Sequence, residues 1–197
     1  SGPHELQALG NPAVSLEQLT DVEPQLCQLR RIKDTDELAM IDRAIACTDA
    51  MYERAREIIA PGIGELEVFN QLHAAAVEVA GEPLTALGND YQCNARGGPP
   101  RQREAQAGEL FILDLGPAYR GYYADNCRTF SVDHNPTDDQ LNAWQAIVNT
   151  LDMVEATVKP GVSSRELYQQ AAEILSGCPL GEFPHHLGHG FGLYPHE

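Results

Sequence analysis

The sequence predicts an α+β domain made of two related halves, each built from two helices followed by strands, with the second half incomplete. The order of the patterns indicates this class, because helical periodicity gives way to short strand-like runs and then returns. A helix–Pro-Gly–helix arrangement also occurs twice, at Pro61-Gly62 and at Pro160-Gly161. Between the two copies, a predicted strand hairpin carries Asp114 and Asp125.

The N-terminal residues differ from the rest of the chain. Residues 1–28 are rich in turn-forming types and contain too short an apolar stretch for a core of their own. We expect them to be the remnant of a preceding N-terminal domain or a linker. The main domain is expected to cover residues 29–197 and to lack its C-terminal strands.

Each element of the main domain has a local signal. Asp34 or Thr35 can cap a helix that ends at Pro61-Gly62, and an apolar stripe with helical spacing runs between them. Short apolar runs bounded by turn residues predict strands. In chain order, we expect a helix from Asp34 or Thr35 to Pro61, a helix over Glu65–Val79, strands over Pro83–Leu87, Leu110–Leu115 and Tyr122–Val132, and helices over Thr137–Val158 and Ser163–Leu175.

The two Pro-Gly copies share more than the dipeptide. In both, a long helix stops at Pro-Gly, one β-branched residue follows, and a polar first turn with an acid begins the next helix. An aromatic residue then stands at the matching place, Phe69 in the first copy and Tyr168 in the second. Helix–Pro-Gly–helix is common enough for chance to be the alternative, but these agreements favour a duplicated unit.

The hairpin is predicted to place Asp114 and Asp125 directly opposite each other. This follows if the strands over Phe111–Leu115 and Tyr122–Phe130 are antiparallel and reverse at Tyr119-Arg120. Opposed Cβ atoms lie about 4.5–5.5 Å apart, so the two carboxylates could grip one or two cations. Without a cation, one carboxylate would have to protonate or the pair would have to move into water. The alternative is turn chemistry, in which each aspartate bonds only to local backbone.

A glycine-spaced histidine run follows near the end of the chain. The glycines within residues 188–192 disfavour a helix, so we expect an extended strand there. In a strand, His185 and His189 share one face, whereas His186 faces the other way. Imidazole added to two carboxylates gives a ligand set that suits Mn, Co, Fe or Zn better than Mg or Ca. Solvated histidines at a polar strand end are the alternative.

Composition limits the function classes. The formal charge of −16, from 29 acidic and 13 basic residues, leaves no basic patch for phosphates and disfavours nucleic-acid binding. The five cysteines contain no Cys-x-x-Cys pair, which indicates free thiols in a reducing compartment, with the cytoplasm as the default. Neither a signal peptide nor a membrane-spanning stretch is visible, so we expect no membrane partner.

Taken in this order, these residues resemble the pita-bread metallopeptidases, the creatinase-like group that includes Xaa-Pro aminopeptidases, prolidases and methionine aminopeptidases. The resemblance covers residues 29–197 and implies the pita-bread fold, with the Xaa-Pro branch as the nearest match. The motifs that carry it are Leu113-Asp114-Leu115-Gly116, Asp125-Asn126-Cys127-Arg128-Thr129-Phe130, and Gly188-His189-Gly190-Phe191-Gly192-Leu193 with His196-Glu197.

The resemblance implies a centre of two divalent metal ions, commonly manganese, with cobalt, zinc or iron as the other candidates. It implies that Asp114 and Asp125 bridge or chelate the metals and that His189 ligates one of them. It also implies that His196 and His185 contact substrate or shuttle protons as catalytic residues. No residue is assigned to any other cofactor.

Three departures from the family pattern stand out. Gly97 occupies a position where the family has a histidine that contacts substrate or transition state. Cys127 stands where a threonine is common. The two metal-ligating glutamates of the family lie beyond the histidine segment, and this chain ends at Glu197, which matches a non-ligand position. The ligand set in residues 1–197 is therefore expected to be incomplete.

The leading expectation is a metal-dependent hydrolase that resembles Xaa-Pro aminopeptidase or prolidase and cleaves a peptide bond next to proline with a metal-activated water. The alternatives are a metal-dependent non-peptide hydrolase or lyase of the same fold, and a binding homologue that has lost catalysis. We expect a peptide substrate and a homodimer. Residues 1–197 alone are expected to bind one metal ion weakly at most, to be inactive, and to expose an unpaired strand edge near His185–Leu193.

Overall fold

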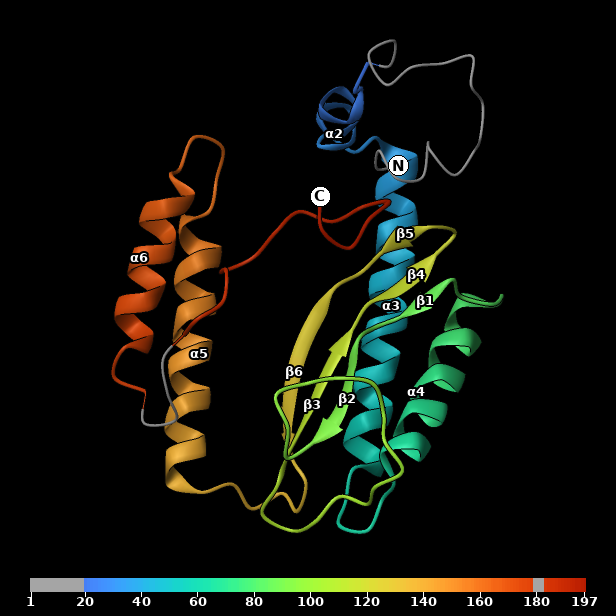
Figure 1. The fold of residues 1–197 in the computed structure, drawn as a ribbon, viewed down its shortest axis with the longest axis vertical. Coiled ribbons are helices and arrows are strands. Elements are labelled where there is room, and N and C mark those ends of the chain that lie inside the picture. The colour runs from blue at the N-terminus through green and yellow to red at the C-terminus, as the bar shows by residue number, and fades with distance from the viewer. Residues whose placement is uncertain (1–19, 179–182) are drawn as a thin grey trace, which may run out of the picture.

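The computed structural model describes residues 20–178 and 183–197 of the chain (Figure 1). The expectation for residues 1–19 lies outside the described residues. Helix α2 (Glu23–Arg30) stands where turns were expected up to residue 28. Its first turn contains Pro24, at a position where the missing N–H would have no helical partner. No residue of α2 is buried, so this helix adds little to the core.

Two long helices, α3 (Thr35–Ile58) and α4 (Glu65–Ala80), pack against each other and confirm the first two predicted helices. The start of α3 is fixed by a capping box at Asp34, one of the two predicted caps. The Asp34 carboxylate accepts hydrogen bonds from the backbone N–H groups of Asp36 and Glu37, and the Glu37 carboxylate accepts one from the N–H of Asp34. Local sequence therefore determines where this layer begins.

The two Pro-Gly turns have nearly the same conformation. Gly62 has φ +94° and Gly161 has φ +92°, a region that favours glycine. In each turn the residue after glycine donates its N–H to the carbonyl of the residue before proline, at 3.2 Å in the first copy and 3.1 Å in the second. The helices α5 (Asp138–Thr157) and α6 (Ser164–Leu175) then repeat the α3–α4 pair. These matches support a duplicated unit.

Within the described residues, the strands form two three-stranded antiparallel sheets. The first sheet has the order β1-β4-β5, with β1 (Ala86–Leu87), β4 (Pro117–Tyr119) and β5 (Tyr122–Tyr123). The second has the order β2-β3-β6, with β2 (Asp90–Cys93), β3 (Leu110–Leu115) and β6 (Asn126–Ser131). The strands β2 and β4 were not expected, and the single run expected over Tyr122–Val132 is divided into β5 and β6.

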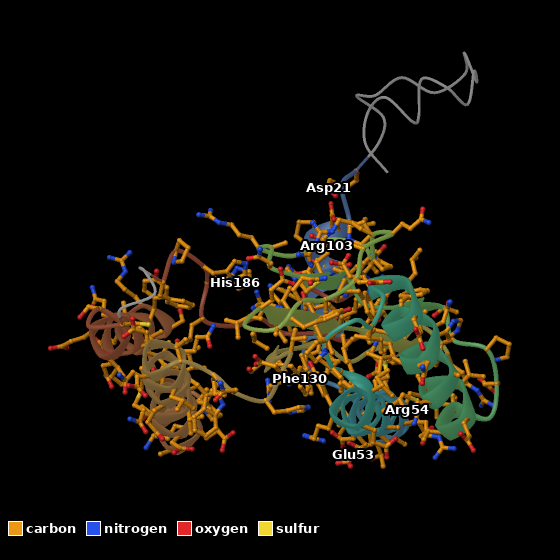
Figure 2. The ribbon with its side chains drawn as sticks, turned by 90° about the horizontal axis from the view of Figure 1, so that it is seen from below. Asp21, Glu53, Arg54, Arg103, Phe130 and His186 are labelled. Atoms are coloured by element: carbon orange, nitrogen blue, oxygen red, sulfur yellow. The ribbon has the colours of Figure 1, made fainter. Side chains whose placement is uncertain are left out.

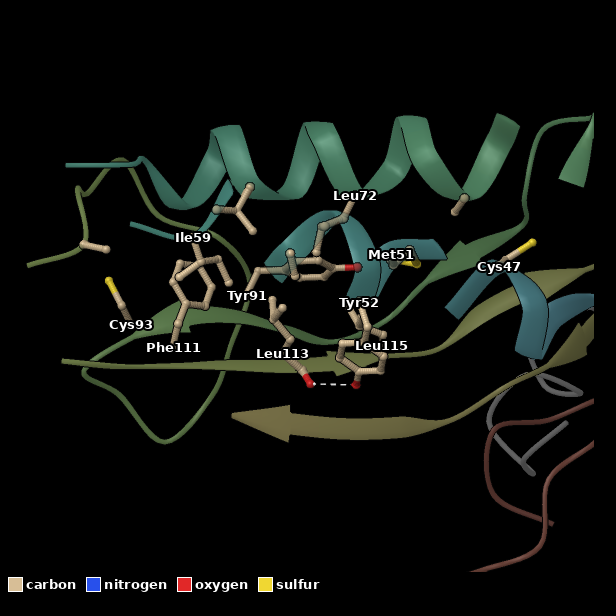
Figure 3. Close-up of a cluster of buried hydrophobic side chains, with 14 of the residues drawn as sticks. Cys47, Met51, Tyr52, Ile59, Leu72, Tyr91, Cys93, Phe111, Leu113 and Leu115 are labelled. Carbon is tan, nitrogen blue, oxygen red and sulfur yellow. Dashed lines mark hydrogen bonds between the residues drawn. The ribbon is translucent and has the colours of Figure 1, made fainter. Parts of the chain in front are cut away.

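The core lies between the α3–α4 layer and one face of the β2-β3-β6 sheet (Figure 3). Phe111, Leu113 and Leu115 alternate along β3 and are fully buried in it. The Tyr52 hydroxyl of α3 lies 3.3 Å from the Leu113 carbonyl and donates to the carbonyl of Asn126 at 2.6 Å. The alternate residues of β3 therefore face the opposite side of the sheet, which is the side of the candidate site.

The helices α5 and α6 pack against each other and form a separate pair beside β6 (Figure 1). No described helix is long and apolar enough to cross a membrane. On α5, apolar residues spaced as on one helix face are exposed, so this face is not covered by any described element: Leu141, Trp144, Ile147 and Leu151.

Candidate metal centre

The hairpin brings Asp114 and Asp125 together, but by a register that differs from the predicted one. Asp114 pairs with Cys127 and not with Asp125, so the predicted opposition of the two aspartates is wrong. The chain reverses at Arg120-Gly121, between the paired residues Tyr119 and Tyr122, and not at Tyr119-Arg120. The pairing is thereby shifted by an even number of residues, and side chains alternate with period two, so Asp125 stays on the face of Asp114.

Asp114 lies in an environment that penalises its negative charge. Burial, with the carboxylates of Asp125 and Asp90 acting in the same direction, raises the pKa of Asp114 to about 6, and His189 opposes this rise. The two aspartate side chains are close enough to share a hydrogen bond. A bound cation would favour the ionised form of both, so the pair is costly alone and favourable around a cation.

His189 faces the carboxylates with the nitrogen that a metal would use. Its Nδ1 lies 3.0 Å from the carbonyl oxygen of Gly190, which only accepts, so Nδ1 carries the hydrogen. In the neutral ring, Nε2 then presents its lone pair to Oδ2 of Asp125 at 3.5 Å. Two acceptors that face each other are stabilised by a proton or a metal ion between them.

Two further imidazoles lie beside His189. His186, His189 and His196 place ring nitrogens within 4.8 Å of one another. The rings of His189 and His196 have centroids 3.8 Å apart, and Nε2 of His196 lies 3.9 Å from Oδ2 of Asp125. His185 is outside this group, with its Nδ1 3.1 Å from the carbonyl of His186. Figure 2 shows His186 between the α5–α6 pair and the rest of the domain.

The predicted strand over the histidine run is wrong, because no strand occurs in the described residues 183–197. Glu197 folds back on this segment instead: its N–H donates to the Gly190 carbonyl at 2.8 Å, and its carboxylate pairs with Lys33 at 2.9 Å. A Cβ on Gly192 would lie 2.6 Å from Oε2 of Glu197, so this glycine makes room for the carboxylate. The unpaired strand edge expected near His185–Leu193 is also partly paired within the chain, since Tyr123 of β5 donates its N–H to the Gly192 carbonyl at 2.8 Å.

Sequence reasoning missed two residues of this region. Asp90 lies beside the centre, because β2 pairs it with Asp114 on the same face, and its Oδ1 accepts the N–H of Gly98 at 2.6 Å. The signal was the alternation in residues 90–93, in which Tyr91 and Cys93 are fully buried, but four residues are too few to read as a strand. Strand alternation predicts that His186 faces away from His189, but this segment is not a strand, and a ring nitrogen of His186 lies within 4.8 Å of one of His189.

The residues that converge here fit a transition-metal ion. Asp114 and Asp125 supply carboxylate oxygens and His189 supplies an imidazole nitrogen, a set that suits Mn, Fe, Co or Zn. A cleft of about 500 Å³ opens beside Asp125, between α3 and the start of β6, and Tyr52 and Phe191 belong to its lining.

Comparison with known proteins gives consistent results. The chain matches the model of Metallopeptidase family M24 over residues 39–197. It is 29% identical over 191 residues to an uncharacterized peptidase of Staphylococcus epidermidis, an alignment that covers 94% of this chain and 54% of that protein. The chain therefore spans about half the length of the curated relatives it matches.

Solved structures show the same fold. The chain is similar to a prolidase from Pyrococcus furiosus, with a TM-score of 0.80 and 25% identity over 95% of this chain and 60% of that chain. It is also similar to an X-Pro aminopeptidase from Thermotoga maritima, with a TM-score of 0.76 and 25% identity over 89% of this chain and 50% of that chain. The fold is the expected pita-bread fold. With the family match covering residues 39–197, the chain belongs to Metallopeptidase family M24.

Proposed function

We propose that the intact protein is an Xaa-Pro peptidase that uses two divalent metal ions, manganese first among them, to cleave a peptide bond next to proline. The observation that carries this proposal is the contact of Asp125 with both other residues: it is close enough to Asp114 to share a hydrogen bond, and its Oδ2 lies 3.5 Å from Nε2 of His189, an arrangement that a cation would stabilise. The similarity to a prolidase and to an X-Pro aminopeptidase supports the proline-directed reaction.

Each side chain has a proposed part in this reaction. Divalent ions, when bound, supply an activated water and polarise the carbonyl to be cleaved. Asp114 and Asp125 hold the ions by charge, and His189 presents Nε2 while the Gly190 carbonyl fixes its Nδ1. His196, whose Nε2 lies 3.9 Å from Oδ2 of Asp125, moves a proton at that nitrogen. His185 contacts the substrate.

The proposal extends to the context of the site. We take the natural substrate to be a peptide and the assembly to be a homodimer in the cytoplasm. The net charge of −16 gives no support to nucleic-acid binding. Because Glu197 is paired with Lys33, it does not add a ligand, and residues 1–197 alone should bind one metal ion weakly at most and lack peptidase activity.

The test uses the product of the intact gene. Elemental analysis should find up to two Mn, Co, Zn or Fe ions per chain, and an Xaa-Pro peptide should be cleaved while the matched Xaa-Ala peptide is not. Asp114→Asn should lose both metal and cleavage. Metal binding without Xaa-Pro cleavage would favour a non-peptide hydrolase or lyase, and absence of both would favour a binding homologue.

A further inference from the structure

The turn that follows β2 runs back along the outer edge of that strand. It contains Gly97 and Gly98, at positions where a larger residue would have no room for its side chain. The N–H of Tyr91 donates to the carbonyl of Gly98 at 2.9 Å, so the turn runs beside β2. A Cβ on Gly97 would lie 2.4 Å from Oδ2 of Asp90, and a Cβ on Gly98 would lie 2.7 Å from Nε2 of Gln92. Real Cβ atoms do not approach other atoms this closely, so any larger residue would displace the β2 side chains.

The same two β2 side chains hold the turn in place. Oδ1 of Asp90 accepts the N–H of Gly98 at 2.6 Å, and Nε2 of Gln92 donates to the carbonyl of Pro99 at 2.8 Å. Gly97 and Gly98 have φ +135° and +128°, a conformation that other residues rarely adopt. The two glycines therefore allow the close approach of the β2 side chains, and these side chains in turn hold the glycine backbone by hydrogen bonds.

This arrangement lies next to the candidate metal centre. Asp90 is the cross-strand partner of Asp114. Neighbouring strands are about 4.8 Å apart, so the turn on the far side of β2 lies roughly 10 Å from β3, the strand that carries Asp114. Three extended peptide residues span about 10 Å, so a peptide bound at the metals is long enough to extend to the backbone of Gly97 and Gly98.

We propose that Asp90 is a positioning residue, which holds the turn of residues 97–99 as a wall without side chains on the β2 side of the substrate site. The inference rests on the proposed function. A hydrogen bond from a backbone N–H to a carboxylate is roughly twice as strong as a neutral one, so Asp90 is the stronger of the two anchors. Without it, the wall is left with Gln92 alone.

The test compares two substitutions of Asp90 in the intact protein. Asp90→Ala removes the acceptor of the Gly98 N–H and should raise KM for the Xaa-Pro peptide about tenfold, with kcat within about twofold and metal content unchanged. Asp90→Asn keeps an acceptor oxygen but loses the charge that strengthens this hydrogen bond, so its KM should rise clearly less than that of Asp90→Ala. A role in overall stability alone would leave KM unchanged in both variants.

A second pair of variants separates contact from backbone strain. Gly97→Ala should displace the Asp90 side chain and raise KM as Asp90→Ala does, and the double variant should show little further rise, because both changes break the same contact. Gly108→Ala is the matched control. Gly108 also has positive φ, +81°, but a Cβ there meets nothing within 4 Å, so this variant should keep the wild-type KM.

Hydrogen exchange of the Gly98 amide, followed by NMR in the same proteins, does not depend on peptidase activity. Asp90→Ala should speed this exchange about tenfold or more, and Asp90→Asn, which keeps a neutral acceptor, should speed it less. A wild-type protein without Xaa-Pro cleavage would count against the proposed function alone, whereas unchanged exchange would overturn the role of Asp90. Wild-type KM in Asp90→Ala, metal loss in that variant, or equal impairment by asparagine and alanine would overturn it as well.

Discussion

Replacing Asp114 by asparagine should make the metal-free protein more stable at pH 7, although it removes a proposed metal ligand. Burial, with Asp125 and Asp90, raises the pKa of Asp114 from 3.8 to about 6 in the folded chain. A carboxyl group whose pKa rises on folding favours the folded state fully below about pH 4, and this contribution is lost as the pH rises through 6. One pKa unit corresponds to about 1.4 kcal/mol, so the ionised group costs about 3 kcal/mol at pH 7.

The assay is urea unfolding of chelator-treated protein. Asp114→Asn should raise the free energy of unfolding by up to about 3 kcal/mol at pH 7 and by roughly half as much at pH 5. Added Mn²⁺ should stabilise the wild type and not the variant. Asp133→Asn is the control and should change the free energy of unfolding in the opposite direction. The N–H of Asn135 and other donors lower the pKa of Asp133, so the loss of this carboxylate should destabilise the fold. A metal-free Asp114→Asn protein that is less stable than wild type at pH 7 would refute this account.

Two further predictions concern the histidines and a buried acid. His189→Ala should lose metal, whereas His196→Ala should keep metal and lose about 10²–10⁴ in turnover, checked by elemental analysis and steady-state rates; equal metal loss would show the roles to be wrong. Glu65 is fully buried and, although burial opposes it, hydrogen bonds from Arg101 and Cys93 hold its pKa at about 2. Glu65→Gln should lower the free energy of unfolding by about 1.5–3 kcal/mol, because it weakens hydrogen bonds to a buried charge while the remaining Arg101 side chain is partly exposed to water, and a loss below about 0.5 kcal/mol would contradict this.

The helices α3 to α6 could be predicted because their signals are local. Asp34 caps α3 and Thr137 caps α5, each through a capping box visible as two residues three apart, and Pro-Gly ends the first helix of each pair. The strands β2 and β4 could not, because they have four and three residues and exist only through their partners. The strand propensity of three or four residues is too weak a signal to predict a strand next to residues that favour turns.

The aspartate pair was found in spite of a wrong register. The turn was placed one residue too early, at Tyr119-Arg120, and the pairing of Asp114 changed from Asp125 to Cys127. Moving a two-residue turn by one position moves the pairing by two, which preserves the face of every side chain. A carboxylate pair that depends on sharing a face is therefore less sensitive to the exact turn than one that depends on direct opposition.

For the histidine segment the prediction is wrong, because strand alternation does not apply to residues that are not hydrogen-bonded along a neighbouring strand. Strand alternation requires a partner along the segment, and within the described residues 183–197 the Gly192 carbonyl alone is bonded to β5. The glycines, read as exposed backbone of a strand, instead make room for Glu197, which lies against Gly190 and Gly192 and is tied to Lys33 at the start of the domain. Because Lys33 and Glu197 lie at opposite ends of the domain sequence, no local window could reveal this contact. His196, the neighbour of Glu197, has its ring centroid 3.8 Å from that of His189, so these two imidazoles meet in a segment that is held to the domain by a tertiary ion pair and does not form a strand.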